Sequence, residues 1–281
     1  MIVFSDNELM SYVSEDVPCG DLTTHLQKAC NVKARLNIYT RERIVASCVK
    51  EASRIGELFG ARVCFSVREG EIAQAEQTLL EFEGSYEALH HVWRSAQNLL
   101  EFSCKIATVT HDMVVKIHEI NPKCELLSTR KSFPFAKKFC IKSVMTGGGF
   151  PHRLGLSETI LLFPQHRVLY ENQNQFLSAV KKMQEKAPEK LVSVETNTFE
   201  EAKILLQHGV ELLQVDKASP QTLEKIVTYK EQFNPKARIL AAGGIGPKNV
   251  QEFAKTGVDG IVTSAIYSVG MANLGSVMER I

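Results

Sequence analysis

Hydrophobic and polar positions follow two different rhythms along the chain. In the N-terminal third, short stretches of alternating apolar positions predict strands, and helical spacing predicts a helix over 51–59. The alternating stretches are 34–38, 63–67 and 78–82. Residues 5–31 have the pattern of a helix followed by a loop, in which Asp21, Thr23 or Thr24 could cap the next element. Strands interleaved with so few helices predict a small α+β domain.

A long helical stretch follows, from about residue 86 to residue 119. Leu89, Trp93, Ala96 and Leu100 fall at helical spacing and form an apolar stripe that predicts a core-facing side. Arg94 lies beside Trp93 at the edge of this stripe. On local pattern alone, such an arginine is usually a surface side chain whose stem covers apolar neighbours.

After Pro122 short apolar runs alternate with helical patterns, which predicts repeated βα units and parallel strands joined by crossover helices. The strand candidates are 124–128, 159–163, 191–194, 211–215, 239–242 and 260–263. The helix candidates lie near 170–186, 199–208, 220–232 and 247–255. The regular spacing favours a barrel with six visible strands, so that either two of eight escape detection or the barrel is incomplete.

The carboxyl ends of barrel strands carry the chemistry in this architecture. Cations, two carboxylates and a glycine pair fall at those ends: Arg130 and Lys131, residues 163–166, Glu195, Asp216, Gly243 and Gly244, Thr263 and Ser264. Glu195 and Asp216 together could hold Mg²⁺ with water and phosphate oxygens, although either acid alone is more often a helix cap or ion-pair partner. Gly243 and Gly244 precede a helix candidate, whose N-terminus can bind phosphate.

Positive charge is concentrated in one segment of a chain whose net charge is only +1. Residues 126–157 contain no Asp or Glu but six Lys or Arg side chains and His152. The six are Arg130, Lys131, Lys137, Lys138, Lys142 and Arg153. Three successive glycines at 147–149 allow a ligand to approach the backbone closely. This segment predicts an anion site, with a solvated surface and a glycine hinge as the alternative.

Composition narrows the class of protein further. The pI is near 7.6 and no basic helix is interleaved with aromatic residues, which argues against a nucleic-acid partner. We expect no signal peptide and no membrane span, because no window is apolar over the roughly 18 residues that a span needs. Seven scattered cysteines without a C-x-x-C motif predict reduced thiols and a cytoplasmic protein.

Several motifs, in order, resemble the quinolinate phosphoribosyltransferase family, the carboxylating nicotinate-nucleotide pyrophosphorylases. The chain looks most similar to the ModD-type branch associated with molybdenum-transport genes. The most specific motif is GGGFPHRLGLSETILL at 147–162. The others are EDVPCGDLTT (15–24), WRSAQNLLEFSCKIAT (93–108), STRKSFP (128–134), SVETNTFEEA (193–202), LQVDKAS (213–219) and AAGGI (241–245).

The resemblance implies two domains and a homodimer with shared active sites. We expect an N-terminal α+β sandwich-like domain over 1–105, with which the tail 268–281 packs. An open, incomplete TIM-like (β/α) barrel is expected over 106–267. In the family, one subunit's N-terminal domain covers the barrel mouth of the other.

The resemblance also implies roles for single residues. Arg130, His152 and Arg153 would hold the carboxylates of an aromatic acid, and Arg94 would reach in from the partner subunit. Lys131 would lie between the acid and pyrophosphate, and Glu195 and Asp216 would bind ribose hydroxyls and Mg²⁺. The residues that would cradle the 5′-phosphate are Gly243, Gly244 and Ser264.

Departures from the family pattern concern the acceptor pocket. Met145 stands where the family has Arg, Phe150 where it has His, and Phe163-Pro164 where it has Lys-Asp. Lys217 replaces an Asn, and VTSAI at 262–266 replaces SVGAL. Two lost cations would weaken the binding of a dicarboxylate, since a charge-assisted hydrogen bond contributes ~1.5–3 kcal/mol.

The sequence therefore predicts a Mg²⁺-dependent phosphoribosyltransferase of the kind used in NAD biosynthesis. It would use phosphoribosyl pyrophosphate and an aromatic carboxylic acid. One alternative is another TIM-barrel enzyme, such as a lyase with Lys131 as a Schiff-base lysine, which requires a desolvated amine. The second alternative is a non-catalytic anion-binding or regulatory protein linked to molybdate uptake.

Overall fold

The chain folds into two compact units, each built from discontinuous segments. The structure is a computed structural model and describes residues 2–28 and 31–281, so that Cys30 lies outside the described residues. The first unit comprises residues 1–111, 133–148 and 269–281, and the second comprises 112–132 and 149–268. Segment 133–148 groups with the first unit, because its helix packs on α3 and the N-terminal segment.

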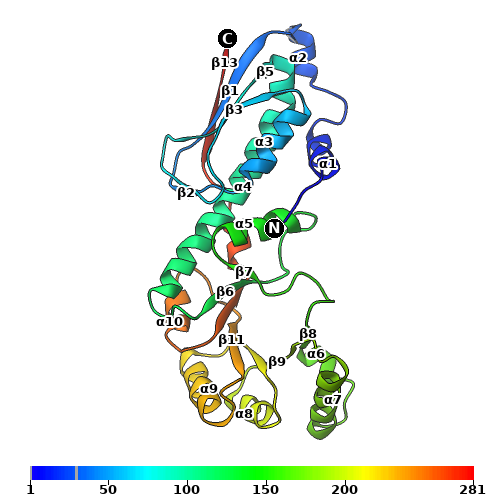
Figure 1. Cartoon of the computed structure of the whole chain (residues 1–281), viewed down its shortest axis with the longest axis vertical. Coiled ribbons are helices and arrows are strands. Elements are labelled where there is room, and N and C mark those ends of the chain that lie inside the picture. The colour runs from blue at the N-terminus through cyan, green and yellow to red at the C-terminus, as the bar shows by residue number, and fades with distance from the viewer. Residues whose placement is uncertain (1, 29–30) are drawn as a thin grey trace. The chain divides into compact units, whose positions relative to one another are not determined.

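An antiparallel sheet forms the centre of the first unit, in the order β13-β1-β5-β3 (Figure 1). Its strands are β1 (Lys33–Thr40), β3 (Arg62–Ser66), β5 (Thr78–Ser85) and β13 (Leu274–Arg280). The C-terminal strand β13 pairs with β1 over seven residues, from Ala34–Arg280 to Thr40–Leu274. Two shorter strands, β2 (Ile44–Val45) and β4 (Ile72–Ala73), pair separately.

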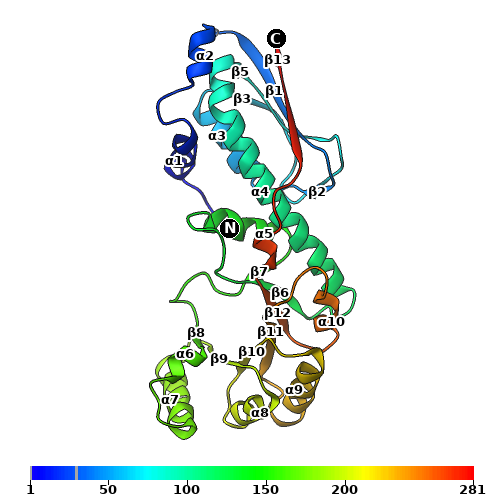
Figure 2. The same ribbon diagram turned by 180° about the vertical axis from the view of Figure 1, so that it is seen from behind.

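Helices cover one face of this sheet (Figures 1 and 2). They are α1 (Asp6–Asp16), α2 (Leu22–Gln27), α3 (Val49–Leu58) and the long α4 (Tyr86–His118). Ser5 and Glu8 form a capping box at the start of α1, and Asp21 caps α2 as predicted. The apolar stripe of α4 packs with β1 and β5 in one core that includes Leu36, Ile38 and Leu89.

Helix α5 (Lys137–Thr146) corrects the interpretation of the basic segment. Its lysines lie in the first unit and are paired with carboxylates that are distant in sequence. Lys138 pairs with Glu8, and Lys142 pairs with Glu51 and, at 3.4 Å, with Glu69. Lys137 also has an interaction partner. The charges of Lys138 and Lys142 are therefore neutralised by ion pairs and do not contribute to an anion field.

A seven-stranded parallel sheet forms the second unit, in the order β7-β6-β12-β11-β10-β9-β8. All six predicted strands are present. They are β6 (Glu125–Ser128), β8 (Ile160–Leu162), β9 (Val192–Thr196), β10 (Leu212–Asp216), β11 (Arg238–Ala242) and β12 (Gly260–Thr263). The seventh, β7 (Phe150–Pro151), was missed because it has only two residues and follows three glycines.

This sheet is an open half-barrel, since β7 and β8 are its two edges. The predicted mixed α/β fold, with a separate antiparallel domain and an incomplete barrel, is confirmed. Helices follow the strands as expected for βα units, and α8 packs beside α9 (Figure 1). They are α6 (Pro164–Arg167), α7 (Gln173–Lys186), α8 (Phe199–Gln207), α9 (Pro220–Phe233) and α10 (Val250–Ala254).

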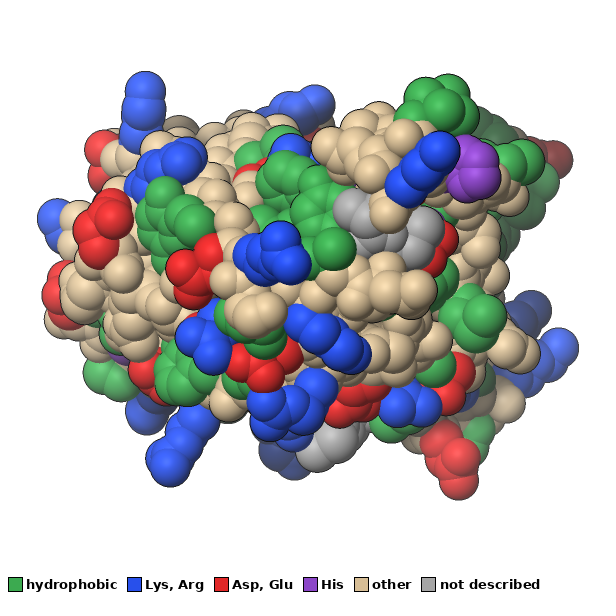
Figure 3. Space-filling model, turned by 90° about the horizontal axis from the view of Figure 1, so that it is seen from above, with side chains coloured by type: hydrophobic (Ala, Val, Ile, Leu, Met, Phe, Trp, Pro, Cys, Tyr) green, Lys and Arg blue, Asp and Glu red, His purple; other side chains and the backbone are tan. Residues whose placement is uncertain are grey.

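Two surface properties accompany this fold. Within residues 2–28 and 31–281, no helix combines the length and the apolar character that crossing a bilayer requires. On the face seen in Figure 3, Lys and Arg side chains are interspersed with Asp and Glu, and hydrophobic side chains form small separate groups. This face therefore presents no continuous field of one sign.

Candidate active site

The site residues of the second unit are placed by strand direction and side-chain alternation. Because the strands are parallel, their carboxyl ends share one edge of the sheet. Leu212, Leu240 and Val262 pack together on the inner face, with Leu127 against them. Glu195 and Asp216 lie further toward the carboxyl ends of β9 and β10, above this apolar layer.

Glu195 and Asp216 form an acidic pair at neighbouring strand ends. Gln214 is opposite Glu195 in the register of β9 and β10, and its Nε2 donates to Glu195 Oε2 at 2.7 Å. Burial raises the pKa of the Glu195 carboxyl, and the nearby Asp216 charge raises it further against the hydrogen bond from Gln214. A carboxylate whose ionisation is disfavoured by burial and by a neighbouring carboxylate is a site that a cation would stabilise.

Arg167 hydrogen-bonds to the backbone of Glu195. Its guanidinium, at the end of α6, donates to the Glu195 carbonyl and pairs with Glu201 of α8. Glu201 also accepts a hydrogen bond from Thr196 Oγ1, and the Arg167 guanidinium carbon lies 4.8 Å from the centre of the Phe176 ring. Two helices and a strand thereby fix the position from which Glu195 projects.

The loop after β11 provides a backbone surface without side chains. Gly243 and Gly244 have φ values of +86° and +72°. A Cβ at Gly243 would lie 2.6 Å from Asp216 Oδ1, whereas a Cβ at Gly244 would meet no atom within 4 Å. Asn249 ties the loop together, accepting from the Gly246 N–H at 2.8 Å and donating to the Gly244 carbonyl at 3.1 Å. Gly244 therefore leaves room for a ligand.

The helix expected to follow this loop is shorter than predicted. Only five residues, Val250–Ala254, are helical, and a turn separates them from the glycines. A helix this short has a weak dipole, so backbone N–H groups of the loop are the better phosphate donors. Ser264 follows β12, where the Thr263 hydroxyl donates to the Ile245 carbonyl at 2.6 Å and keeps the two loops together.

Strands β6 and β7 position the remaining cations of the second unit. The Thr129 N–H donates to the Thr263 carbonyl at 3.0 Å, and the His152 N–H donates to the Ser128 carbonyl at 2.9 Å. Arg130 and Lys131, which follow β6, have exposed side chains. The Schiff-base alternative requires a desolvated lysine, and exposed Lys131 does not meet that requirement.

Arg153 is a buried arginine without an anion. Its exposed fraction is 8%, and the described part of the chain offers its guanidinium no hydrogen-bond or ion-pair partner. The guanidinium carbon lies 5.6 Å from the centre of the Phe163 ring. Burial lowers the pKa of Arg153, and the Arg130 charge lowers it further. A largely buried arginine whose guanidinium has no ion-pair or hydrogen-bond partner among the described residues is suited to a ligand that carries a negative charge.

His152 differs from its predicted role as a cation. Burial lowers the pKa of its imidazole to about 4, and the adjacent Arg153 charge acts in the same direction. At neutral pH the ring is therefore uncharged and offers one donor and one acceptor. It can hydrogen-bond an acid, but it adds no charge.

Arg94 lies in the first unit, on α4. Its side chain is exposed, and its guanidinium carbon lies 5.0 Å from the centre of the Trp93 ring. The indole Nε1 donates to Gln97 and to Ser276, which fixes the ring beneath the arginine. Stacking on Trp93 accounts for an arginine at the edge of an apolar stripe.

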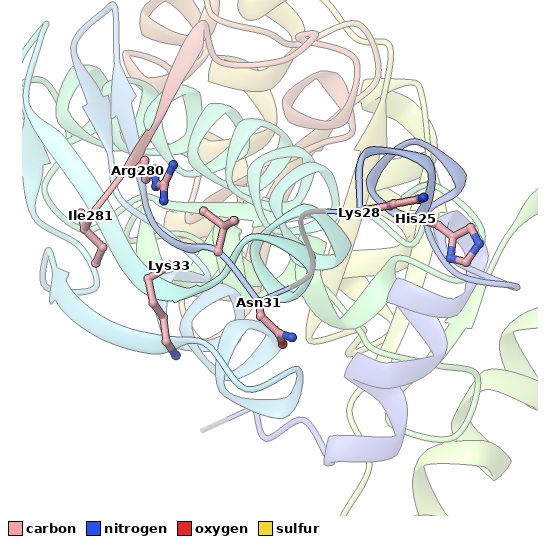
Figure 4. A pocket seen from close by; sticks show the side chains of 7 residues that line it. His25, Lys28, Asn31, Lys33, Arg280 and Ile281 are labelled. Carbon is pink, nitrogen blue, oxygen red and sulfur yellow. The ribbon is translucent and has the colours of Figure 1, made fainter.

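A cavity of about 680 Å³ in the first unit contains none of the predicted site residues. Its basic lining residues are His25, Lys28, Lys33 and Arg280. Figure 4 shows Lys28 and Lys33 pointing in different directions instead of converging on one point. The cavity therefore presents no focused charge.

Gln214 and Arg167 are the site residues that sequence reasoning missed. Gln214 interrupts the apolar run of 212–215, and a polar side chain in a buried strand was the available signal. Arg167 had no such signal, because its partner Glu201 is 34 residues away.

Comparisons with known proteins agree with this architecture. The N-terminal domain of quinolinate phosphoribosyl transferase matches residues 21–104, and its C-terminal domain matches residues 106–273. A protein of Pasteurella multocida that is named as the pyrophosphorylase ModD is 30% identical over 280 residues, which cover 100% of this chain and 99% of the relative. A protein of Methanocaldococcus jannaschii named as a carboxylating nicotinate-nucleotide pyrophosphorylase is 27% identical, over 92% of each chain.

The fold is shared with solved structures of lower identity. NadC from Streptococcus pyogenes superposes with a TM-score of 0.88 at 23% identity, covering 98% of this chain and 96% of the other. The nicotinate-nucleotide pyrophosphorylase from Francisella tularensis gives a TM-score of 0.89 at 22% identity, covering 99% and 98%. With both domains matched along nearly its whole length, the chain belongs to the quinolinate phosphoribosyl transferase family.

Proposed function

We propose that this protein transfers phosphoribose from phosphoribosyl pyrophosphate to the ring nitrogen of a pyridine or other aromatic carboxylic acid. The observation that carries the proposal is Arg153, which is 8% exposed and has no partner within the described residues. Its unmet charge calls for an acid, while Glu195 and Asp216 on the same sheet suit a sugar and a cation. The pyrophosphorylase names of the relatives support the same reaction class.

In the proposed reaction, the lone pair of the ring nitrogen forms a bond to C1 of the ribose. The bond from C1 to pyrophosphate breaks, and its electron pair leaves with pyrophosphate. With a 2-carboxylate on the ring, that group leaves as carbon dioxide and its electron pair stays on the ring carbon, which takes up a proton. Arg130, Arg153 and neutral His152 orient the acid, and Lys131 stabilises the departing charge.

The acidic pair fits a hard divalent cation such as Mg²⁺. Glu195 and Asp216 supply oxygen ligands, and their mutual repulsion is what a cation relieves. Within the described ranges, no group of three or more His, Cys, Asp or Glu side chains forms a protein-only metal site. Mg²⁺ bound to two carboxylates, water and pyrophosphate oxygens suits this donor set, and the ion would neutralise the leaving group.

The alternative of a non-catalytic anion-binding protein is less well supported. A site that only binds an anion gains nothing from two carboxylates at its mouth, because they repel the ligand. Glu195 is moreover held in place by Gln214 and Arg167, which is the arrangement expected of a side chain that must be oriented. Any link to molybdate uptake remains a prediction from the resemblance.

Ligand-dependent melting tests the proposal directly. Phosphoribosyl pyrophosphate should raise the melting temperature of the wild type much more when Mg²⁺ is present, because ligands that bind only the folded state stabilise it. The double variant Glu195→Gln with Asp216→Asn should lose the Mg²⁺-dependent part. Exposed acids replaced in the same way, Glu224→Gln with Asp16→Asn, provide the control. An unchanged shift in the site variant would remove the acidic pair from the proposed function.

We further propose that the pocket for the acceptor acid binds quinolinate poorly. Phe163 stacks with His166 and lies against Arg153, where an aromatic ring buries apolar area that a cation would not. We expect poor kcat/KM for quinolinate and tighter binding of a monocarboxylic or larger aromatic acid.

The variant Phe163→Lys tests this preference. It should raise kcat/KM for quinolinate by ~10-fold, since ~1.4 kcal/mol from a charge-assisted bond corresponds to that factor. Phe233 is exposed and provides a matched control. The variant Phe233→Lys should leave kcat/KM for quinolinate unchanged. Efficient quinolinate turnover by the wild type would contradict the prediction.

The homodimer with shared active sites also belongs to the proposal. Arg94 would act on the site of the partner subunit, as the family resemblance implies. Its exposed guanidinium, fixed on Trp93, is available for such a role. A cytoplasmic location remains a prediction from the sequence.

A further inference from the structure

Gln214 is a buried amide whose nitrogen is hydrogen-bonded and whose oxygen is not. The residue is 6% exposed, and its Nε2 donates to Glu195 Oε2 at 2.7 Å. Its Oε1 is buried and has no hydrogen-bond partner in the described part of the chain. A buried amide oxygen left without a partner destabilises the folded state, so such an atom requires an explanation.

A second unpaired atom lies on the same face of the sheet. Ser193 precedes Glu195 by two residues on β9, and it is 2% exposed with an unpaired Oγ. Thr196 bonds to Glu201 of α8 on the outer side, so alternation places Ser193 and Glu195 on the inner face with Gln214. Register puts Ser193 opposite Leu212, two residues below Gln214. The inner face thus carries two unused polar atoms beside Glu195.

The orientation of Gln214 follows from its neighbour. A carboxylate accepts hydrogen bonds, so the amide nitrogen must face Glu195 and the amide oxygen must face elsewhere. The free atom is therefore an acceptor. A ligand group that donates can satisfy it, whereas carboxylate and phosphate oxygens would be repelled.

We propose that Gln214 is a specificity-determining residue that accepts a hydrogen bond from a ribose hydroxyl of the phosphoribosyl donor. This inference rests on the proposed function. Of the two substrates, the aromatic acid brings carboxylates, which are acceptors, whereas the sugar brings hydroxyl donors. Because the Gln214 amide bonds to Glu195, the two side chains can accept from the two adjacent hydroxyls of one ribose.

Sugar phosphates that differ by one hydroxyl test the inference without turnover. Calorimetric titration measures Kd for ribose 5-phosphate, 2-deoxyribose 5-phosphate and 3-deoxyribose 5-phosphate in the presence of Mg²⁺. The wild type should prefer ribose 5-phosphate over both deoxy compounds. In Gln214→Met, ribose 5-phosphate should bind ~10-fold more weakly, by the loss of one hydrogen bond, and one of the two preferences should fall to within about twofold.

The other outcomes are distinct. An equal loss of affinity for all three sugars would mean that Gln214 only positions Glu195, and persistence of both preferences would mean that it contacts no hydroxyl. Either result overturns the inference and leaves the proposed function standing. A wild type that binds none of the three, with no Mg²⁺-dependent response to phosphoribosyl pyrophosphate, overturns both. Gln251→Met on the exposed side of α10 is the matched control and should behave as wild type.

Discussion

Arg153 and Arg167 show that partners, more than burial, determine what an arginine does in this protein. Arg167 is bound by Glu201, by the Glu195 carbonyl and by the Phe176 ring. Arg153 is more deeply buried, yet its guanidinium lies over the Phe163 ring and has no ion-pair or hydrogen-bond partner among residues 2–28 and 31–281. Arg167 stabilises the fold. Arg153 has a charge that a ligand could neutralise, and its burial without an ion-pair partner lowers stability.

The same substitution at the two positions should therefore have different effects. Arg167→Gln should lower the free energy of unfolding by about 2–3 kcal/mol, because it leaves Glu201 without its cation. Arg153→Gln should change it by less than about 1 kcal/mol, or increase it, because an unpaired buried charge is removed. Chemical denaturation of both variants measures the difference. Equal destabilisation would show that Arg153 has a structural partner after all.

His152 makes the stability of the folded protein depend on pH. Its pKa of about 4 in the folded state lies below the usual 6.5, because burial disfavours the charged ring. Above pH 6.5 the ring is neutral in both states and contributes no pH dependence. As the pH falls from 6.5 toward 4, the unfolded state binds the proton first, so stability is lost in that window.

Comparison with a variant isolates this contribution. The free energy of unfolding of wild type minus that of His152→Gln should fall by about 3 kcal/mol between pH 7 and pH 4. The exposed His25 provides the control, because His25→Gln should change the difference little. A difference that stays constant with pH would mean that His152 titrates normally in the folded protein.

Among the elements, the loop after β11 separates structural from ligand-facing glycine. Both glycines have positive φ, so alanine is strained at either position by roughly 1 kcal/mol. Only Gly243 is also packed, with Asp216 Oδ1 2.6 Å and the Lys217 nitrogen 2.8 Å from the position of its missing Cβ. Gly244 faces open space.

Alanine at each position should thus produce a different defect. Gly243→Ala should cost about 2–4 kcal/mol of stability, through strain and the displacement of Asp216. Gly244→Ala should cost only about 1 kcal/mol but should weaken ribose 5-phosphate binding ~10-fold or more, because the methyl group fills the space left for phosphate. Denaturation and calorimetry on both variants test this. Unchanged binding by Gly244→Ala would exclude the loop from the phosphate site.

At the scale of the whole molecule, each unit is assembled from separated segments. Strand β13, the last in the chain, completes the first sheet by pairing with β1. Helix α5 joins the same unit through Lys138 and Lys142. Segment 112–132 and residues 149–268 together carry the predicted barrel residues. In the proposed homodimer, the active site would likewise be assembled from separate segments, in this case from two copies of the chain.

Mixing two inactive chains tests whether the site is shared. Arg94→Ala and Lys131→Ala should each be inactive alone. After random subunit exchange, about a quarter of wild-type activity should return, because half of the dimers are mixed and each has one intact site. Each variant mixed with itself is the control. Absence of recovery, with exchange verified by labelled subunits, would argue that Arg94 serves its own subunit or only the fold.

The sequence by itself determined the elements and the edge at which the predicted site residues lie. Periodicity identified six of the seven parallel strands, and parallel strands necessarily bring their carboxyl ends to one edge. For this reason the sequence alone places Arg130, Glu195, Asp216 and Gly243 at the same edge of the sheet. These features depend on local pattern and chain direction, which the order of residues contains.

Only the tertiary structure decided which charges are free. Lys138 and Lys142 were counted as part of an anion field, but Glu8 and Glu51 neutralise them from segments 130 and 91 residues away. His152 is neutral at pH 7, and Gln214 turns its amide oxygen away from Glu195. Arg153 is 8% exposed and has no ion-pair or hydrogen-bond partner in the part of the chain that the structure describes. Ion pairing, desolvation and hydrogen bonding depend on distances between folded segments, and those distances are not contained in the spacing along the chain.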